Sequence, residues 1–269
     1  MMQFDFTDKV VFVTGGSMGI GEAICKQFAE AGAKVAVAGR NMDNIQRVVD
    51  EITAAGGTAI PVPCDIRKEE DVKAAVQKTL DAFGGRLDIL VNNAGVVDSG
   101  LVEKKSLEEW NRVIDTDLTG TFLCTREVMP IMKKQHFGRI IIIGSIVGKR
   151  TGILSGVAYT AAKAGQIGFS HQCAVEGAPF NVTCNVVNPG STLTPLQVHH
   201  TPAETLKNKA KMIPAGRLGT PEDMANATLF FASEYANYIN GAHIDVDGAW
   251  LYNYVSSEKY YEMLGEELY

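Results

Sequence analysis

Several features that would place this chain of 269 residues in a special class are missing from it. It has five cysteines, an odd number, and none stand at the spacing of a zinc or redox motif. No basic run of five or more residues occurs, and the net charge is −6, which disfavours a nucleic-acid or membrane surface. No apolar run approaches the ~20 residues that span a bilayer, and the polar start MMQFDFTDK is unlike a signal peptide. We therefore expect a cytoplasmic protein with buried thiols, and no metal, nucleic-acid or membrane partner.

Internal repeats, low-complexity tracts and domain linkers are also missing, so the length predicts one domain over residues 1–269. Short apolar runs, mostly β-branched, recur instead at 10–13, 34–38, 59–62, 87–91, 139–143, 181–187 and 242–246. Between them, residues 19–31 and 68–83 carry apolar side chains at helical spacing. Repeated strand–helix–strand units predict an α/β fold, a Rossmann-type doubly wound parallel β-sheet flanked by helices on both faces.

A glycine-rich turn, TGGSMGIG at 14–21, follows the first predicted strand and precedes a predicted helix. Glycines 15, 19 and 21 (Gly15, Gly19, Gly21) stand where the strand passes into the helix. Glycine there lets backbone N–H groups approach a pyrophosphate at the positive end of the helix. A glycine triplet alone is a weak signal, but the strand and the helix around it are predicted independently. The turn therefore predicts a dinucleotide-binding site.

The end of the second predicted strand bears on which dinucleotide binds. The chain there reads Gly39-Arg40-Asn41, without the carboxylate that a free ribose 2′-hydroxyl prefers. Arg40 suits a 2′-phosphate because its guanidinium donates paired hydrogen bonds to an oxyanion. We therefore favour NADP (NADPH) over NAD, the alternative being that Arg40 only stacks on adenine. Asp65, which ends the third predicted strand, is a candidate partner for the adenine amino group.

Tyr159 and Lys163 share one face of a predicted helix, because they stand at i and i+4 in AYTAAKAG. An unperturbed tyrosine has a pKa of about 10. An adjacent ammonium favours the phenolate, which makes Tyr159 a usable general acid or base. Ser145 follows the strand at 139–143, at the carboxyl edge where such sheets bind ligands, and its hydroxyl can hydrogen-bond a substrate oxygen. These three side chains are the candidate catalytic groups.

Five motifs together resemble the short-chain dehydrogenase/reductase family, in its order and across about residues 7–250: TGGSMGIG, NNAG at 92–95, the set Ser145–Tyr159–Lys163, NPGSTLT at 188–194 and DGAW at 247–250. The resemblance implies hydride transfer between nicotinamide C4 and a carbinol carbon of a small-molecule substrate, with Tyr159 moving the proton. It also implies a homotetramer, and Lys163 as a ligand of the nicotinamide ribose. The further cofactor-binding residues that we assign are Ser17, Met18, Ile20, Asn41, Ile66, Asn92, Ala94, Gly95, Pro189, Gly190, Thr192 and Thr194.

Asp117 departs from the family pattern. In IDTDLTGTFL at 114–123, Asp115 and Asp117 lie close together in a predicted helix, and a carboxylate is costly to bury without a partner. The family usually has asparagine at 117, which helps to hold a water that relays protons to the lysine. An ionised aspartate is nearly isosteric but cannot donate a hydrogen bond. We expect Asp117 to point inward, pair with Lys163 directly or through water, and tune the relay. The alternative is that it only ties down the helix backbone.

The substrate-binding residues are less constrained by the sequence. Residues 191–214 are polar and proline-bearing, long for a connection from a strand to a helix, and we expect a mobile substrate lid or else a surface insertion. Arg150, His199 and His200 are candidates for contact with an anionic group. The expected pocket is mostly apolar, which favours a fairly hydrophobic alcohol or ketone of steroid, bile-acid or aromatic type. Its residues are Val96, Val97, Ser145, Ile146, Val147, Leu154, Leu193, Leu196, Val198 and Met212.

A C-terminal extension, about 251–269, continues past the usual end of the family and holds five tyrosines. We expect it to close over a pocket, its own or a neighbouring subunit's, or to pack along an oligomer interface. The leading functional prediction is an NADP-dependent oxidoreductase that interconverts a secondary alcohol and a ketone. The alternatives are a 3-oxoacyl thioester reductase, a sugar or polyol dehydrogenase, and a non-catalytic dinucleotide-binding subunit.

Overall fold

A central sheet organises the molecule in the computed structural model, which describes residues 4–152, 155–253 and 255–265, without the side chains at 196, 199 and 200. The sheet has seven parallel strands in the order β3-β2-β1-β4-β5-β6-β7. The strands predicted from the apolar runs are confirmed, and most are buried on both faces, which explains why those runs do not alternate. Their bounds are β1 Val10–Thr14, β2 Lys34–Gly39, β3 Thr58–Pro63, β4 Ile89–Asn92, β5 Gly138–Ile143, β6 Val182–Pro189 and β7 His243–Val246.

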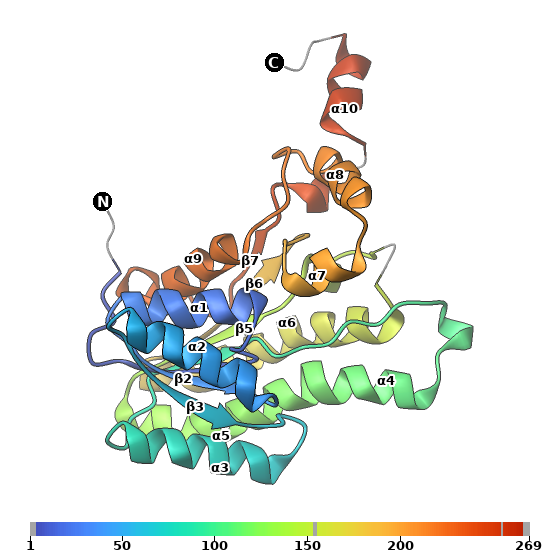
Figure 1. Cartoon of the computed structure of the whole chain (residues 1–269). Helices are drawn as coiled ribbons and strands as arrows, with labels where there is room; N and C mark the ends of the chain where they lie inside the picture. The colour runs from blue at the N-terminus through green and yellow to red at the C-terminus, as the bar shows by residue number, and fades with distance from the viewer. Residues whose placement is uncertain (1–3, 153–154, 254, 266–269) are drawn as a thin grey trace.

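Helices cover both faces of the sheet, as predicted (Figure 1). The helices of one face are α1 (Gly19–Glu30), α2 (Met42–Ala54) and α9 (Pro221–Ala232). Those of the other are α3 (Glu69–Ala82), α5 (Gly120–Gln135) and α6 (Val157–Gly177), and α4 (Leu107–Val113) precedes α5. Each layer encloses its own apolar core against the sheet. The two cores are filled by the apolar stripes that the helical spacing predicted.

The sheet order places a crevice at the centre of its carboxyl edge. The chain runs outward through β2 and β3 on one side of β1, and through β5, β6 and β7 on the other side of β4. Connections after β1 and β4 therefore leave in opposite directions, and the carboxyl ends of these two strands part. The glycine turn follows β1, and NNAG begins at the last residue of β4. The topology thus brings these two motifs to one crevice.

The stretch IDTDLT, Ile114–Thr119, is a π-helical turn between α4 and α5 rather than part of a regular α-helix. A π-turn holds one residue more than an α-turn, and such turns are frequent at functional sites. The Asp117 carbonyl accepts hydrogen bonds of 2.6 Å each from Thr121 Oγ1 and from Gln166 Nε2 on α6. The Asp117 side chain is fully buried, whereas Asp115 is exposed. The expectation that Asp117 is the inward-facing acid is confirmed.

The expectation of a polar loop over 191–214 needs a correction, because most of it is helical. Two helices fill it, α7 (Pro195–His200) and α8 (Ala203–Met212). Thr194 caps α7 through a hydrogen bond from Gln197 N, and Pro195 occupies the first helical position, where its missing N–H costs nothing. Beyond β7, the extension carries α10 (Ser257–Leu264), which stands away from the sheet layers in Figure 1.

Two absences apply to the described part of the chain. There, no helix is both long and apolar enough to cross a membrane. Nor do the described histidine, cysteine and acidic side chains gather in a group of three or more that is suited to a metal ion. All five cysteines are buried and free of disulfides, as expected.

Candidate functional site

The glycine turn presents the N-terminus of α1 toward the crevice. Gly15 and Gly19 adopt φ values of 64° and 56°, in the region that glycine enters without strain. A Cβ at Gly21 would stand 2.2 Å from the Gly15 carbonyl oxygen, so this position also requires glycine. Met18 precedes α1, and no side chain caps the helix. The first amides of α1 are therefore available to a phosphate, which fits a bound dinucleotide.

Thr14 and Asn93 join the two halves of the crevice, and neither was singled out from the sequence. Thr14 Oγ1 accepts hydrogen bonds from the backbone N–H groups of Asn93 at 2.9 Å and Ala94 at 3.0 Å. The Asn93 amide donates to the carbonyls of Thr14 and Gly15, both at 3.0 Å. In the sequence, the only sign of this role of Asn93 is the pair of asparagines in NNAG. These bonds fix the glycine turn against the loop after β4.

Arg40 and Asp65 face a hollow of about 390 Å³ beside the ends of β2 and β3, with Pro63, Cys64 and Asp71 among its lining residues. Arg40 is exposed and forms no ion pair with a described residue. Asp65 is held by Arg67 at 2.5 Å, and this guanidinium lowers the pKa of the Asp65 carboxyl to about 2. The guanidinium of Arg40 is thus free to meet a phosphate, whereas the Asp65 carboxylate already has a cationic partner.

The three candidate catalytic residues lie around the carboxyl end of β5. Ser145 follows β5, is nearly buried, and accepts a hydrogen bond from Val147 N at 3.3 Å. Tyr159 is the third residue of α6 and Lys163 follows one turn later. The Lys163 ammonium lies 5.4 Å from the centre of the Tyr159 ring and donates to the Ile143 carbonyl at 3.0 Å. The helix thus carries both side chains to the end of the strand that carries the serine.

Asp117 meets Lys163 directly. Its Oδ2 lies 3.3 Å from Lys163 Nζ, and both side chains are buried. Asp117 Oδ1 accepts a hydrogen bond from Val96 N at 2.8 Å, and a Cβ at Gly95 would stand 2.9 Å from Oδ2. Burial raises the pKa of the Asp117 carboxyl above its ordinary value, and the Lys163 ammonium opposes that rise. Asp117 therefore both holds the loop after β4 and brings a charge to the lysine.

Asp98 is a further buried carboxylate at this site that the sequence analysis did not identify. Its Oδ1 accepts a hydrogen bond from the backbone N–H of Tyr159 at 3.0 Å. Gly156, which precedes α6, has no side chain to cap the helix, and its N–H donates to the Asp98 carbonyl at 2.9 Å. Lys105 Nζ lies 3.4 Å from Asp98 Oδ2. A residue remote in sequence thus supplies the missing cap of the helix that carries Tyr159.

The other expected cofactor-binding residues take varied positions. Asn92 is buried and donates to Thr125 Oγ1 at 3.1 Å, so its side chain is bound to α5. Ile20 and Ile66 pack into the two cores. Thr194 is near Gly19, since a Cβ at Gly19 would lie 3.4 Å from it. The rest remain near the crevice through their places in the chain: Ser17 and Met18 in the glycine turn, Asn41 as the cap of α2, Ala94 and Gly95 after β4, and Pro189, Gly190 and Thr192 at the end of β6.

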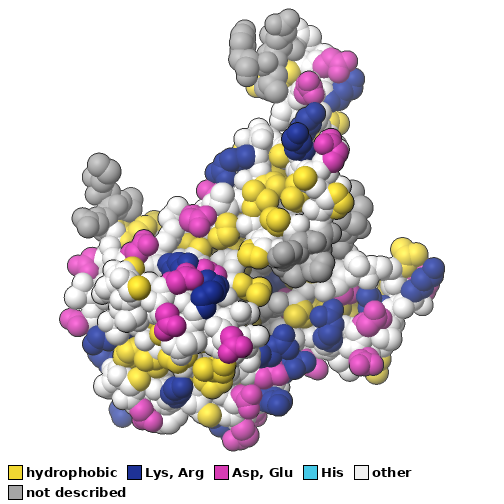
Figure 2. Space-filling model, in the orientation of Figure 1, with side chains coloured by type: hydrophobic (Ala, Val, Ile, Leu, Met, Phe, Trp, Pro, Cys, Tyr) yellow, Lys and Arg dark blue, Asp and Glu magenta, His cyan; other side chains and the backbone are white. Residues whose placement is uncertain are grey.

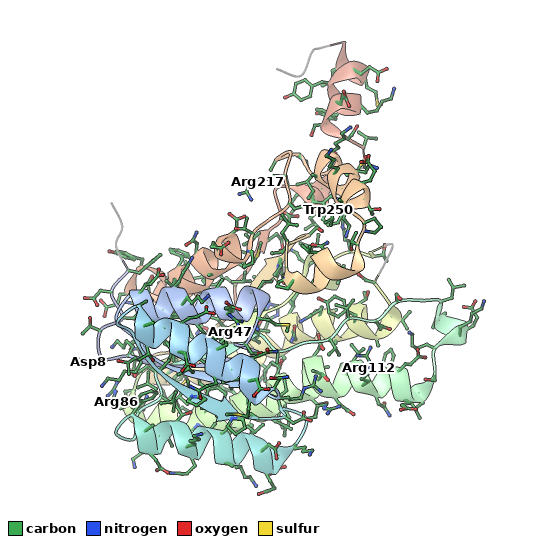
Figure 3. The ribbon with its side chains drawn as sticks, in the orientation of Figure 1. Asp8, Arg47, Arg86, Arg112, Arg217 and Trp250 are labelled. Atoms are coloured by element: carbon green, nitrogen blue, oxygen red, sulfur yellow. The ribbon has the colours of Figure 1, made fainter. Side chains whose placement is uncertain are left out.

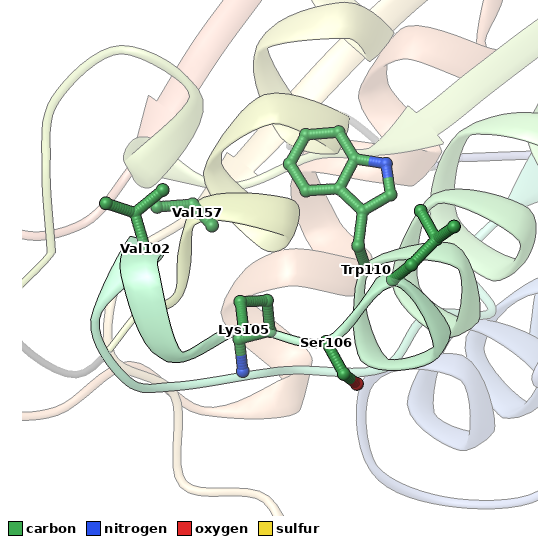
Figure 4. Close-up of a pocket in the computed structure, with 6 residues that line it drawn as sticks. Val102, Lys105, Ser106, Trp110 and Val157 are labelled. Carbon is green, nitrogen blue, oxygen red and sulfur yellow. The ribbon is translucent and has the colours of Figure 1, made fainter.

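The expected substrate residues are only partly described. Val97 is half exposed and Val147 is buried after Ser145. Leu154 and the Leu196 side chain lie outside the described residues. A second hollow, of about 340 Å³, lies beside the start of α6 and is shown in Figure 4. Apolar side chains form much of its wall, which is lined by Val102, Lys105, Ser106, Leu107, Trp110 and Val157.

Comparison with known families and relatives gives matches over most of the chain. A family described as enoyl-(acyl carrier protein) reductase matches residues 15–250. A 3-oxoacyl-[acyl-carrier-protein] reductase of Aquifex aeolicus is 41% identical over 92% of this chain and 99% of its own length. A 2,5-dichloro-2,5-cyclohexadiene-1,4-diol dehydrogenase of Sphingobium indicum is 37% identical over 90% of this chain and 96% of its own.

Solved structures resemble the fold closely. An actinorhodin polyketide ketoreductase with NADPH superposes with a TM-score of 0.86 at 29% identity, covering 90% of this chain and 97% of that one. A 3-oxoacyl-[acyl-carrier protein] reductase with bound NAD from Brucella melitensis gives a TM-score of 0.83 at 31% identity, covering 91% of each chain. Both dinucleotides therefore occur among proteins that share this fold.

Proposed function

Since this chain belongs to the short-chain dehydrogenase/reductase family, we propose that it is an NADP-dependent oxidoreductase that interconverts a secondary alcohol and a ketone on a fairly hydrophobic substrate. The observation that carries the proposal is the set of Ser145, Tyr159 and Lys163 at the end of β5, with Asp117 behind the lysine. Its relatives are named as oxidoreductases, which leaves no support for a non-catalytic subunit.

The residues of the crevice fit a dinucleotide. The amides at the uncapped start of α1 would hold the pyrophosphate, and Arg40 would hold a 2′-phosphate. When bound, the nicotinamide accepts or supplies the hydride at the carbinol carbon. Arg40 supports NADP because it is exposed, cationic and without an acidic partner in the described part of the chain.

Proton transfer falls to Tyr159. During alcohol oxidation its phenolate takes the hydroxyl proton, and during ketone reduction its phenol returns it, so that charge does not build up on the substrate oxygen. The Lys163 ammonium lies 5.4 Å from the centre of the Tyr159 ring, one helical turn further along α6. The Ser145 hydroxyl orients the same oxygen by a hydrogen bond, which positions the carbinol carbon for the hydride.

A direct test compares dinucleotides and then ketones. NADPH at ~100 times its Kd should stabilise the protein by ~2.7 kcal/mol in a thermal-shift assay, and NADH at the same concentration by less. NADPH consumption is then followed with an aromatic ketone, a steroid ketone, a 3-oxoacyl thioester and a ketose. Tyr159→Phe should bind NADPH normally and reduce none of them. Stabilisation by neither dinucleotide would overturn the proposal.

A second candidate function is the reduction of a 3-oxoacyl thioester. The match to the 3-oxoacyl-[acyl-carrier-protein] reductase of Aquifex aeolicus, over nearly its full length, favours it. The catalytic residues would act in the same way, because the group reduced is again a ketone, at the β-position of the thioester. A kcat/KM for acetoacetyl-coenzyme A well above that for the aromatic and steroid ketones would select this function.

We also propose a homotetramer. Apolar side chains on the outer faces of α5 and α6 support it, because Phe122 is 42% exposed and Val175 is 71% exposed in the single chain. Light scattering coupled to size-exclusion chromatography measures the assembly directly. A monomer at micromolar concentration would contradict the proposal.

A further inference from the structure

Arg150 reaches from the loop of Ser145 to the loop after β7. Its Nη1 donates to the Trp250 carbonyl at 2.7 Å and to the Leu251 carbonyl at 3.4 Å. Its Nε is buried, and no described residue accepts a hydrogen bond from it. No described residue accepts one from Nη2 either. Nη2 is therefore the nitrogen of this guanidinium that is free to donate a hydrogen bond to a carboxylate or a phosphate.

Lys209 adds a second cation at the same place. It projects from α8, and its ammonium lies 6.0 Å from the centre of the Trp250 ring, while the Arg150 guanidinium lies 5.0 Å from it. Figure 3 shows Trp250 beside α8. Burial lowers the pKa of the Lys209 ammonium, and no described acidic side chain forms an ion pair with it. Two half-buried cations thus share one aromatic ring.

The nearby acids of this loop are already engaged. Asp247 uses both oxygens on the backbone N–H groups of Ala249 at 2.9 Å and Leu251 at 2.6 Å. Asp245 pairs with Lys149 at 2.5 Å. The positive charge of Arg150 and Lys209 therefore has no counter-ion among the described residues. Both cations lie against one ring, so an anion bound beside that ring would be stabilised by both positive charges.

Backbone hydrogen bonds set the position of the Arg150 backbone relative to Ser145. Gly148 N donates to the Ser145 carbonyl at 3.0 Å, and Arg150 N donates to the Ile146 carbonyl at 3.1 Å. Figure 2 shows cationic side chains next to apolar ones on the part of the surface that carries α8. We expect a substrate held at Ser145 by its oxygen to extend toward the two cations.

We propose that Arg150, Lys209 and Trp250 form a subsite for an anionic group at the end of the substrate remote from the reacting carbon. This inference rests on the proposed function, because it adds a charged end to the apolar alcohol or ketone. A carboxylate on the substrate and a phosphate of a thioester carrier share the required chemistry. Arg150 meets the anion with Nη2, Lys209 adds a second positive charge beside the Trp250 ring, and the ring covers the adjoining apolar part.

The test uses binding to the complex with NADP⁺, so that no turnover is needed. Isothermal titration measures the Kd of 4-acetylbenzoate against its methyl ester, and of acetoacetyl-coenzyme A against acetoacetyl-N-acetylcysteamine. The anionic member of at least one pair should bind roughly 10- to 100-fold more tightly than the neutral one. A preference confined to the first pair identifies a carboxylate substrate, and one confined to the second identifies a phosphate.

Two variants separate recognition from a structural role of Arg150. Arg150→Gln and Lys209→Gln should each remove most of the preference for the anion. Each should change the Kd of the neutral member less than twofold. Lys209→Gln leaves the bonds from Arg150 to Trp250 and Leu251 intact. Lys207→Gln, an exposed position on the same helix, is the matched control and should change neither. Equal binding of both members in both pairs by the native protein overturns the subsite. Active reduction of the neutral ketones would then leave the proposed function standing.

Discussion

The two buried carboxylates near Tyr159 act on different parts of the catalytic set. Asp117 places its charge 3.3 Å from the Lys163 ammonium, whereas Asp98 holds the Tyr159 backbone through its N–H. The first arrangement affects the electrostatics of the reaction, and the second affects the position of the phenol. Arg40 faces the hollow beside the ends of β2 and β3, and we expect its guanidinium to favour NADP.

Asp117→Asn should shift the pH dependence of alcohol oxidation to lower pH. The substitution keeps an oxygen for Val96 N but removes the negative charge beside Lys163, so the ammonium acts unopposed and favours the Tyr159 phenolate. The acid limb of the kcat/KM profile should move to lower pH. Asp115→Asn, at the exposed acid of the same turn, is the control and should leave the profile unchanged. Superimposable profiles for Asp117→Asn would restrict Asp117 to holding the loop.

Arg40→Gln should weaken the use of NADPH selectively. A bond between a guanidinium and a phosphate contributes ~1.5–3 kcal/mol, so kcat/KM for NADPH should fall roughly 10- to 100-fold. The same constant for NADH, measured in parallel, should change less than threefold because NAD lacks the 2′-phosphate. A similar loss for both dinucleotides would show that Arg40 contacts the adenine instead.

At the scale of elements, the start of α6 is where Asp98 and Gly156 meet the helix that carries Tyr159. Gly156 has no side chain, and a Cβ there would stand 2.1 Å from Asp98 Oδ2. The glycine therefore makes room for the carboxylate that caps the helix from the loop after β4. The π-helical turn before α5 also connects to α6, because the Asp117 carbonyl accepts a hydrogen bond from Gln166 of α6. Both contacts tie α6 to loops of the crevice.

Asp98→Ala should lower the free energy of unfolding by ~1 kcal/mol through loss of the cap, with a fall in kcat because Tyr159 is no longer held. Gly156→Ala should destabilise the protein by displacing the same carboxylate. Chemical denaturation of the two single variants and the double variant measures the coupling. The cost of Gly156→Ala should shrink in the Asp98→Ala background, since no carboxylate remains to be displaced. If the two losses in the free energy of unfolding simply add in the double variant, Asp98 and Gly156 do not interact.

At the scale of the whole molecule, the sheet and its two helical layers form one body, and the C-terminal extension adds little to it. The two sheet cores contain no residue of α10. Its apolar side chains are exposed in the single chain, with Tyr260 at 54% and Met263 at 70%. α10 thus contributes no residue to either core, and we expect its role to be closure over a substrate or assembly.

Deletion of residues 255–269 should leave the circular dichroism spectrum and the unfolding midpoint of the chain unchanged within about 2 °C, because almost no core surface is lost. KM and subunit assembly are then measured separately on the truncated chain. A raised KM with intact assembly assigns the extension to closure over the substrate, and a weakened assembly assigns it to an interface. A large drop in the unfolding midpoint at unchanged assembly would contradict the expectation.

The sequence by itself determined the strands, the sheet-flanking helices, the glycine turn and the set of Ser145, Tyr159 and Lys163. The strands, the helices, the glycine turn and the pair Tyr159–Lys163 follow from local period, from glycine at a strand-to-helix turn and from i,i+4 spacing. Ser145 follows from its place just after a predicted strand and from the resemblance to the family. Only the tertiary structure decided the direct contact of Asp117 with Lys163, the cap that Asp98 gives to α6, and the meeting of Arg150 and Lys209 at Trp250. Each of these joins residues that lie far apart in the chain, and contacts of that kind are fixed by how loops meet at the carboxyl edge of the sheet.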